Sequence, residues 1–184
     1  MDIWTALAYF QEVETARCLL RPVRMSDLNA FASIASNPEN TQFIFPAREN
    51  KDELRVLLAH YFIKQPLGIW AVTLKGSSDL IGVIRLENLA ILHKKAEIGY
   101  FLHRDFWGQG VMTECVKTVV DLSFSNFGLE QLVIKTHVEN GASARVAQKS
   151  GFKVSHSYRG SDRYTHEIRQ FTDYTLTRKE WQDE

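Results

Sequence analysis

Two glycines, Gly108 and Gly110, stand on either side of a single glutamine in the segment HRDFWGQGVMTE. A strand pattern gives way to a helix pattern at this point. Glycine leaves the neighbouring backbone N–H groups uncovered, and the first turn of a helix adds further N–H groups with a partial positive charge. Such an arrangement binds an anion through the backbone alone, so the segment predicts an anion-binding loop.

Two better-known glycine motifs do not fit the segment. A dinucleotide fingerprint needs a third glycine three positions after Gly110, where Thr113 stands. A Walker loop needs Gly-Lys-Ser/Thr, which the segment lacks. NAD and ATP are therefore disfavoured, and a glycine-rich turn without a ligand remains the alternative.

Composition indicates one globular domain over residues 1–184, with a core of about 17–178. Of the 184 residues, 45% are hydrophobic, which is enough to bury a sizeable core. Lys+Arg and Asp+Glu number 22 each, so no net charge favours nucleic acid or an anionic membrane as a partner. Cys18 and Cys115 both fall in apolar patterns and are predicted to be buried free thiols. With no basic start and no long apolar run, the chain is expected in the cytoplasm.

Strand and helix patterns alternate in a way that predicts a mixed α/β (α+β) fold. Its central sheet is mixed and mostly antiparallel, with six to seven strands flanked by about four helices. Apolar spacing and caps place the helices at 28–36, 52–63, 111–127 and 142–150. Alternating segments place strands at 16–23, twice within 68–89, and at 96–102, 132–138, 152–160 and 168–177.

Three segments in order, EIGYFL, DFWGQGVMTE and VENGASARVAQKSGF, resemble the acetyl-CoA core of the GNAT superfamily of N-acetyltransferases. The similarity is greatest to the ribosomal-protein N-terminal (Rim-type) branch. It spans 96–152, and the segment RCLLRPVRMSDL is similar to the opening strand and helix of that branch. The resemblance implies an enzyme that moves acetyl from acetyl-CoA directly to a primary amine, without a metal.

The resemblance also implies which residues bind the cosubstrate. The glycine loop would hold the pyrophosphate of coenzyme A, and Asn140 would bond the pantetheine arm while capping its helix. Asp105 stands where many members have Gln or Arg, so backbone N–H groups are expected to do the binding. The predicted cofactor-binding residues are Tyr100, Phe101, Leu102, Trp107, Gly108, Gln109, Gly110, Val111, Met112 and Asn140.

Acetyl transfer needs a proton acceptor, a donor to the carbonyl oxygen and mild acid help for the departing thiol. Many family members use a tyrosine as the acid, but Ala147 stands at that position. Ser143, one helical turn after Asn140, is the predicted acid, and the alternative is a helix-terminal hydrogen bond. Glu97 is the predicted base and Glu87 an alternative, although either could instead be an ion-pair partner.

The remaining polar candidates have ordinary explanations. His137 lies in an apolar strand and is expected to be a hydrogen-bonded core residue, whereas His93 and His103 are expected in loops. No His or Cys spacing indicates a metal site. Lys149 is a phosphate ligand or a solvated helix residue, and Glu114 compensates the dipole of its helix.

The resemblance favours a protein N-terminal amine as the acceptor, with a polyamine, amino acid or antibiotic as the alternative. A non-catalytic acyl-CoA-binding module is a further possibility, because the usual tyrosine is missing. The segment 37–63, expected over the acceptor side, mixes acidic and aromatic residues: Glu39, Glu49, Asp52, Glu53, Phe43, Phe45 and Tyr61. The protein is expected to be a monomer or a homodimer.

Overall fold

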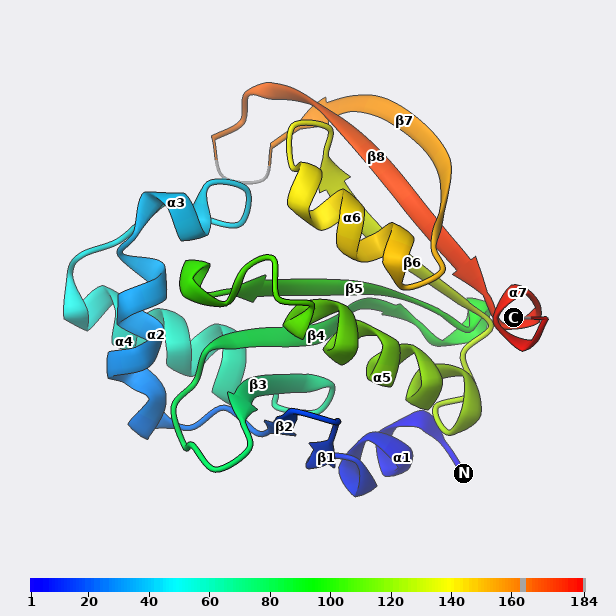
Figure 1. Ribbon diagram of the computed structural model, residues 1–184, viewed down its shortest axis with the longest axis horizontal. Helices are drawn as coiled ribbons and strands as arrows, with labels where there is room; N and C mark the ends of the chain where they lie inside the picture. Colours follow the sequence, from blue (N-terminus) through cyan, green and yellow to red (C-terminus); the bar gives the residue numbers. More distant parts are fainter. Residues whose placement is uncertain (163–164, 184) are drawn as a thin grey trace. The chain divides into compact units, whose positions relative to one another are not determined.

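The computed structural model describes residues 1–162 and 165–183. The chain divides into two compact units, Met1–Arg85 with Tyr100–Cys115 and Leu86–Gly99 with Val116–Glu184. We call these the first unit and the second unit. Three elements run from one unit into the other, namely β4 (Gly82–Ala90), β5 (Lys95–Leu102) and α5 (Val111–Ser125) (Figure 1).

The described residues form eight strands of one sheet, in the order β1-β2-β3-β4-β5-β6-β8-β7, and seven α-helices. The predicted mixed α/β fold with a mostly antiparallel sheet is therefore confirmed. The structure has more elements than the expected six to seven strands and four helices. The additional ones are all short: β1 (Val13–Glu14), α1 (Ile3–Tyr9), α3 (Pro38–Thr41) and α7 (Arg178–Gln182).

In the first unit, an antiparallel ladder joins β1 to β2 (Cys18–Arg21), β2 to β3 (Ile69–Leu74) and β3 to the start of β4. Helices α2 (Leu28–Ala35) and α4 (Lys51–Leu58) lie side by side (Figure 1). The helix predicted at 52–63 continues after α4 as a π-helical turn over Ala59–Ile63. Short 3₁₀ turns over Met25–Asp27 and Arg104–Phe106 complete the unit.

Four aromatic rings pack against one another in the core of the first unit. Phe31 lies 5.5 Å from Phe62 and 6.2 Å from Phe101 between ring centroids, and Phe45 lies 5.9 Å from Phe101. Burying one such side chain contributes roughly 1.5–3 kcal/mol. Because Phe101 is on β5, this cluster fixes the strand end that leads into the glycine loop.

Helix α1 was not expected from the sequence. Its cap is Asp2, whose side chain accepts hydrogen bonds from the N–H groups of Trp4 and Thr5. Ala6 and Leu7 pack in the core, and the ring N–H of Trp70 donates to the carbonyl oxygen of Phe10 at 2.9 Å. The apolar run is short, so its helical period is too brief to identify from sequence alone.

In the second unit, β5 pairs in parallel with β6 (Gln131–His137), and β6 pairs antiparallel with β8 (Ile168–Thr177). Strand β7 (Lys153–Ser161) lies at the edge beside β8. Helix α6 (Gly141–Lys149) connects β6 to β7. A 3₁₀ turn over Ile91–His93 joins β4 to β5.

Predicted helix ends are confirmed in the second unit. Gly128 and Gly151 follow α5 and α6 with φ of +69° and +87°, in the left-handed region that favours glycine. The side chain of Asn140 caps α6 by accepting from the N–H of Ser143. No helix among the described residues is long and apolar enough to cross a membrane.

Candidate active site

The loop between β5 and α5 exposes a row of unbonded backbone N–H groups. Its backbone turns through the left-handed region twice, with φ of +72° at Gly108 and +75° at Gly110. Among the described residues, no acceptor of the chain meets the N–H groups of 108–113. The N–H of Glu114 is the first to be bonded, to the carbonyl oxygen of Gly110 at 3.0 Å. Alternating backbone turns at a helix N-terminus are a common form of anion site.

Side chains beside the loop are largely used for packing. Val111 and Met112 are 3% and 5% exposed, and Phe101 and Leu102 are also buried. Of the predicted cofactor-binding residues, these four can therefore offer a ligand mainly their backbone groups. This fits the expectation that the loop binds through N–H groups.

Two side chains of the loop hold it in shape. The ring N–H of Trp107 donates to the carbonyl oxygen of Leu102 at 2.8 Å, although the residue is 46% exposed. The side-chain amide of Gln109 donates to the carbonyl oxygen of Asp105 at 2.7 Å. Gln109, predicted as a cofactor ligand, thus has its amide committed to closing the loop.

Glu114 is held by a residue that no sequence motif identified. Its Oε2 accepts from Nε of Arg17 at 2.7 Å, and its Oε1 accepts from the backbone N–H of Arg17 at 2.7 Å. The hydroxyl of Thr15 donates to the same Oε1 at 2.5 Å. Glu114 lies in the first turn of α5 as predicted, and it also anchors the β1–β2 connection. The partners are 97 positions apart, so spacing could not have identified them.

Hydrogen bonds keep the side chains of Glu114 and Arg17 charged. Burial raises the pKa of Glu114, but the hydrogen bonds from Thr15 and Arg17 outweigh this effect and the pKa is lowered overall. The hydrogen bond from Arg17 to Glu114 raises the pKa of the guanidinium. Both groups are therefore ionised throughout the physiological pH range.

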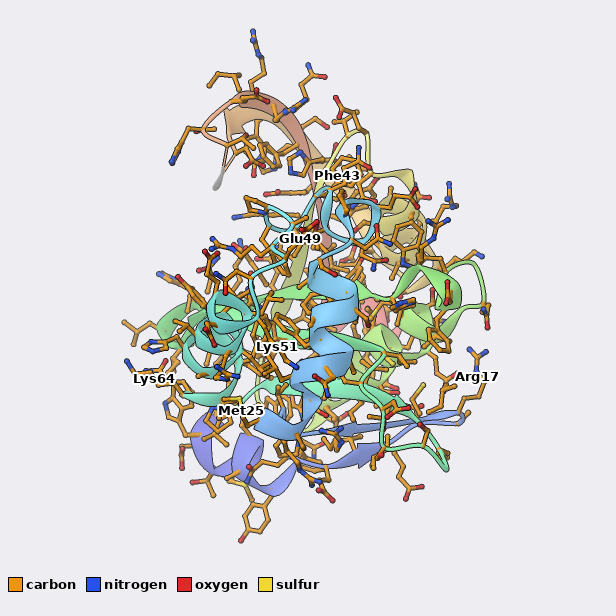
Figure 2. All side chains as sticks on the ribbon, turned by 90° about the vertical axis from the view of Figure 1, so that its left-hand side faces the viewer. Arg17, Met25, Phe43, Glu49, Lys51 and Lys64 are labelled. Atoms are coloured by element: carbon orange, nitrogen blue, oxygen red, sulfur yellow. The ribbon has the colours of Figure 1, made fainter. Side chains whose placement is uncertain are left out.

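The acidic residues of the expected acceptor segment are mostly paired with arginines. Glu53 lies 3.0 Å from Arg48, between a carboxylate oxygen and Nη1. Asp52 pairs with Arg55 and Glu39 with Arg104. Figure 2 shows Lys51 near the middle of the view and Lys64 at the left-hand edge of the molecule. Three of the four acidic residues in the segment 37–63 are therefore neutralised by arginines, which weakens any acidic surface there.

In the second unit, the side chain of Asn140 makes the cap of α6. Oδ1 of Asn140 accepts from the backbone N–H of Ser143 at 3.1 Å. Ala147, at the position where many family members have a tyrosine, is fully buried. Lys149 is exposed at the end of the helix.

Glu97 is an ion-pair partner in the structure. Its Oε1 lies 2.7 Å from Nζ of Lys135 on β6, and its side chain is 17% exposed. The carboxylate of Glu87 lies against Gly99, where a Cβ would come within 3.1 Å of it. Positions 97 and 99 face the same side of β5. Because the carboxylate of Glu87 lies against Gly99, it is on the same face of the sheet as Glu97.

Strands β5 and β6 pair over only three residues each. The register runs from Lys95 opposite Gln131 to Glu97 opposite Val133. Residues 98–99 of β5 and 134–137 of β6 therefore lie beyond the parallel ladder. An N–H on the side of β5 that faces away from β4 is the kind of donor that could stabilise a developing oxyanion here.

Tyr158 on β7 lies near this group of charges. Burial and the charge of Asp173 raise the pKa of its phenol, while Lys135 lowers it by a smaller amount. Its ring stacks on those of His156 and Phe171, with centroids 5.2 Å and 5.7 Å away. The hydroxyl is thus protonated at neutral pH.

The histidines have structural surroundings. Nε2 of His137 lies 3.3 Å from a carboxylate oxygen of Asp162, and its ring packs on Phe171 with centroids 4.6 Å apart. His93 is exposed, and Nδ1 of His103 accepts from the N–H of Asp105 at 3.2 Å. No cluster of three metal-binding side chains occurs in the described part of the chain.

Comparison with known proteins agrees with this geometry. The family model described as "Acetyltransferase (GNAT) domain" matches residues 17–153. The uncharacterized N-acetyltransferase YoaA of Bacillus subtilis is 30% identical over 148 residues, which cover 78% of this chain and 84% of YoaA. The Escherichia coli ribosomal-protein-serine acetyltransferase is 36% identical over 74 residues, covering 40% and 41% of the two chains.

Two further relatives differ in their acceptors. The spermidine N(1)-acetyltransferase of Escherichia coli is 24% identical over 136 residues, covering 73% of this chain and 72% of the enzyme. A structure of RimL, a ribosomal L7/L12 alpha-N-protein acetyltransferase in complex with coenzyme A, superposes with a TM-score of 0.74 at 19% identity. It covers 90% of this chain and 97% of RimL. The chain belongs to the GNAT family of acetyltransferases.

Proposed function

We propose that the chain is a single-domain N-acetyltransferase that moves acetyl from acetyl-CoA to a primary amine. The observation that carries the proposal is the row of unbonded N–H groups at 108–113, with left-handed glycines at the start of α5. A pyrophosphate fits this row because each N–H can donate to a phosphate oxygen and the helix N-terminus favours negative charge. The backbone of Gly108 to Met112 would hold it, whereas the N–H of Trp107 already donates to the carbonyl oxygen of Arg104 at 3.0 Å. The motif resemblance implies Tyr100 to Leu102 and Asn140 as ligands of the pantetheine arm.

The amine attacks the thioester carbon directly in this proposal. A C–N bond forms, the C–S bond breaks, the nitrogen loses a proton and the thiolate gains one. Glu97, Glu87 or an ordered water takes the first proton, and Ser143 supplies the second. A backbone N–H of β5 bonds the carbonyl oxygen as it gains charge.

A covalent acetyl-enzyme is disfavoured by the state of the two thiols. Cys18 and Cys115 are fully buried, and both are free. Burial raises the pKa of each thiol, most strongly that of Cys115. Because the thiolate is the nucleophile, neither residue is suited to accept the acetyl group.

We propose a protein N-terminal amine as the acceptor. This rests on the Rim-type motifs and on the ribosomal-protein relative. The ion pairs of the segment 37–63 support it as well, because three of its four carboxylates are neutralised by arginines and would attract a polycation such as spermidine only weakly. A small-amine acceptor remains the second candidate, since a spermidine acetyltransferase is also a relative. The cytoplasm remains the predicted compartment.

Release of free coenzyme A from acetyl-CoA tests the proposal. Peptides beginning with serine or alanine would be compared with the same peptides blocked at the N-terminus, and with spermidine and single amino acids. We expect thiol release with free-ended peptides and none with blocked ones. Coenzyme A binding without turnover on any amine would indicate a non-catalytic acyl-CoA-binding module instead.

A further inference from the structure

Arg17 lies far from the glycine loop in the sequence, but its guanidinium contacts this loop in the folded chain. Its Nη1 donates to the carbonyl oxygen of Gln109 at 3.0 Å, while its Nε bonds Glu114 at 2.7 Å. Its Nη2 lies 3.6 Å from the point where a Cβ on Gly110 would sit. We propose that Arg17 is a positioning residue of the loop, which orients the peptide between Gln109 and Gly110 for phosphate binding. This inference rests on the proposed function.

The orientation follows from the planarity of the peptide group. In a trans peptide the C=O and N–H bonds point in opposite directions. A hydrogen bond that holds the carbonyl of Gln109 toward Arg17 therefore directs the N–H of Gly110 away from Arg17. That N–H belongs to the unbonded row at 108–113.

The loop needs such a contact because it has glycine on both sides of Gln109. Glycine adopts positive and negative φ with similar ease, so this peptide can rotate at little energetic cost. The side-chain amide of Gln109 bonds the carbonyl oxygen of Asp105. This bond does not hold the main-chain carbonyl of Gln109, which must be fixed by another group. Arg17 supplies that bond from the turn before β2.

Glu114 in turn fixes Arg17. The carboxylate bonds both the guanidinium and the backbone N–H of Arg17, and Thr15 bonds the carboxylate. Figure 2 shows Arg17 at the edge of the molecule, and its side chain is 49% exposed. An exposed arginine would otherwise sample many rotamers, so the carboxylate limits its guanidinium to one orientation.

Electrostatics and positioning make opposite predictions for Glu114. A carboxylate near a phosphate repels it, so if charge alone mattered, Glu114→Gln would strengthen coenzyme A binding. If Glu114 acts by holding Arg17, the same substitution weakens binding. The sign of the change therefore separates the two roles.

The experiment measures dissociation constants by calorimetry for coenzyme A and for pantetheine, which has no phosphate. We expect Arg17→Met to weaken coenzyme A binding by about tenfold and Glu114→Gln by roughly three- to tenfold, with pantetheine binding unchanged. Arg17→Lys should remain weakened, because an ammonium cannot reproduce the planar fork that bonds two acceptors. Arg24→Met is the matched control, since Arg24 is also an exposed arginine paired with a glutamate, Glu12.

Several outcomes would overturn the inference. These are unchanged coenzyme A affinity in Arg17→Met, full rescue by Arg17→Lys, or tighter binding in Glu114→Gln. Equal weakening for coenzyme A and pantetheine would indicate general loss of structure, which thermal melts of the same samples would reveal. If the unsubstituted protein does not prefer coenzyme A to pantetheine, the proposed function of the loop fails as well, and this result is distinct from the others.

Discussion

Nζ of Lys135 lies 2.7 Å from Oε1 of Glu97, so the first candidate base is already paired with a cation. The pair joins β6 to β5 next to the end of their parallel ladder. The hydrogen bond that Lys135 donates to Glu97 raises the pKa of Lys135, which keeps the ammonium charged. The carboxylate of Glu97 therefore has a structural role, whether or not it also acts as a base.

Substitution of each partner separates these two roles. We expect Glu97→Gln to lower the acetyl-transfer rate by about a hundredfold or more, as for loss of a general base. Lys135→Met removes the ion pair and keeps the carboxylate, so its rate should fall much less. Single-turnover rates and thermal melts would be measured for both variants. If both variants lose the same stability and keep normal transfer rates, Glu97 acts only as an ion-pair partner. Glu87 would then become the candidate base.

Gly110→Val tests the backbone site. Valine adds a Cβ beside the phosphate position and is strained at φ of +75°, so we expect coenzyme A binding to weaken by tenfold to a hundredfold, about 1.4–2.8 kcal/mol. Gly128→Val is the matched control, because its φ is +69° and a Cβ there meets nothing within 4 Å. Both variants should lose roughly 1–3 kcal/mol of stability from strain. Only Gly110→Val should lose affinity, and equal affinities would contradict the loop assignment.

The thiols should be unreactive in the folded protein. Burial raises the pKa of Cys18 and Cys115, and neither side chain is exposed. We expect negligible reaction with a disulfide reagent at pH 8, and reaction of two thiols per chain after unfolding in urea. Rapid labelling of the native protein would contradict the buried state of these residues.

Acid should weaken the Arg17–Glu114 pair only at low pH. The pKa of Glu114 is lowered in the folded state from an ordinary value of 4.5. Its stabilising effect is therefore fully present above that value and is lost as the pH falls through the lower, folded-state pKa. The melting temperature of the unsubstituted protein should exceed that of Glu114→Gln at pH 7, and the difference should vanish toward pH 3. A melting-temperature difference that grows as the pH falls would contradict the lowered pKa of Glu114.

Local sequence patterns predicted the elements around the loop correctly. Glycine at 108 and 110, the apolar side of α5 and the ends at Gly128 and Gly151 all depend on residues within a few positions of each other. The burial of Cys115 followed from the same helical period. Such features are determined by backbone conformation and short-range spacing.

Long-range contacts could not be predicted in this way. The bonds of Arg17 to Glu114 and Gln109 join segments more than ninety positions apart. Lys135 as the partner of Glu97, and Gly99 as the residue beneath Glu87, depend on strand order and register. The acidic residues of 37–63 were expected over the acceptor side, and the arginine partners of three of them become evident only in the folded chain.

Ser143 provides the sharpest test of the chemistry, because Asn140 already caps the helix. If the hydroxyl donates to the departing sulfur, Ser143→Ala should slow acetyl transfer by roughly ten- to a thousandfold. Coenzyme A affinity and melting temperature should stay nearly unchanged. Asn140→Ala should instead cost about 0.5–2 kcal/mol of stability through loss of the cap.

Single-turnover transfer to an accepted amine, beside thermal melts of both variants, checks this prediction. Normal transfer in Ser143→Ala would show that the hydroxyl is not the acid. Tyr158 would then be the next candidate, because burial and the charge of Asp173 raise its pKa and keep its proton available at neutral pH. Tyr158→Phe and Tyr100→Phe would be measured in the same assay, and normal rates in both would leave an ordered water as the donor to the thiolate.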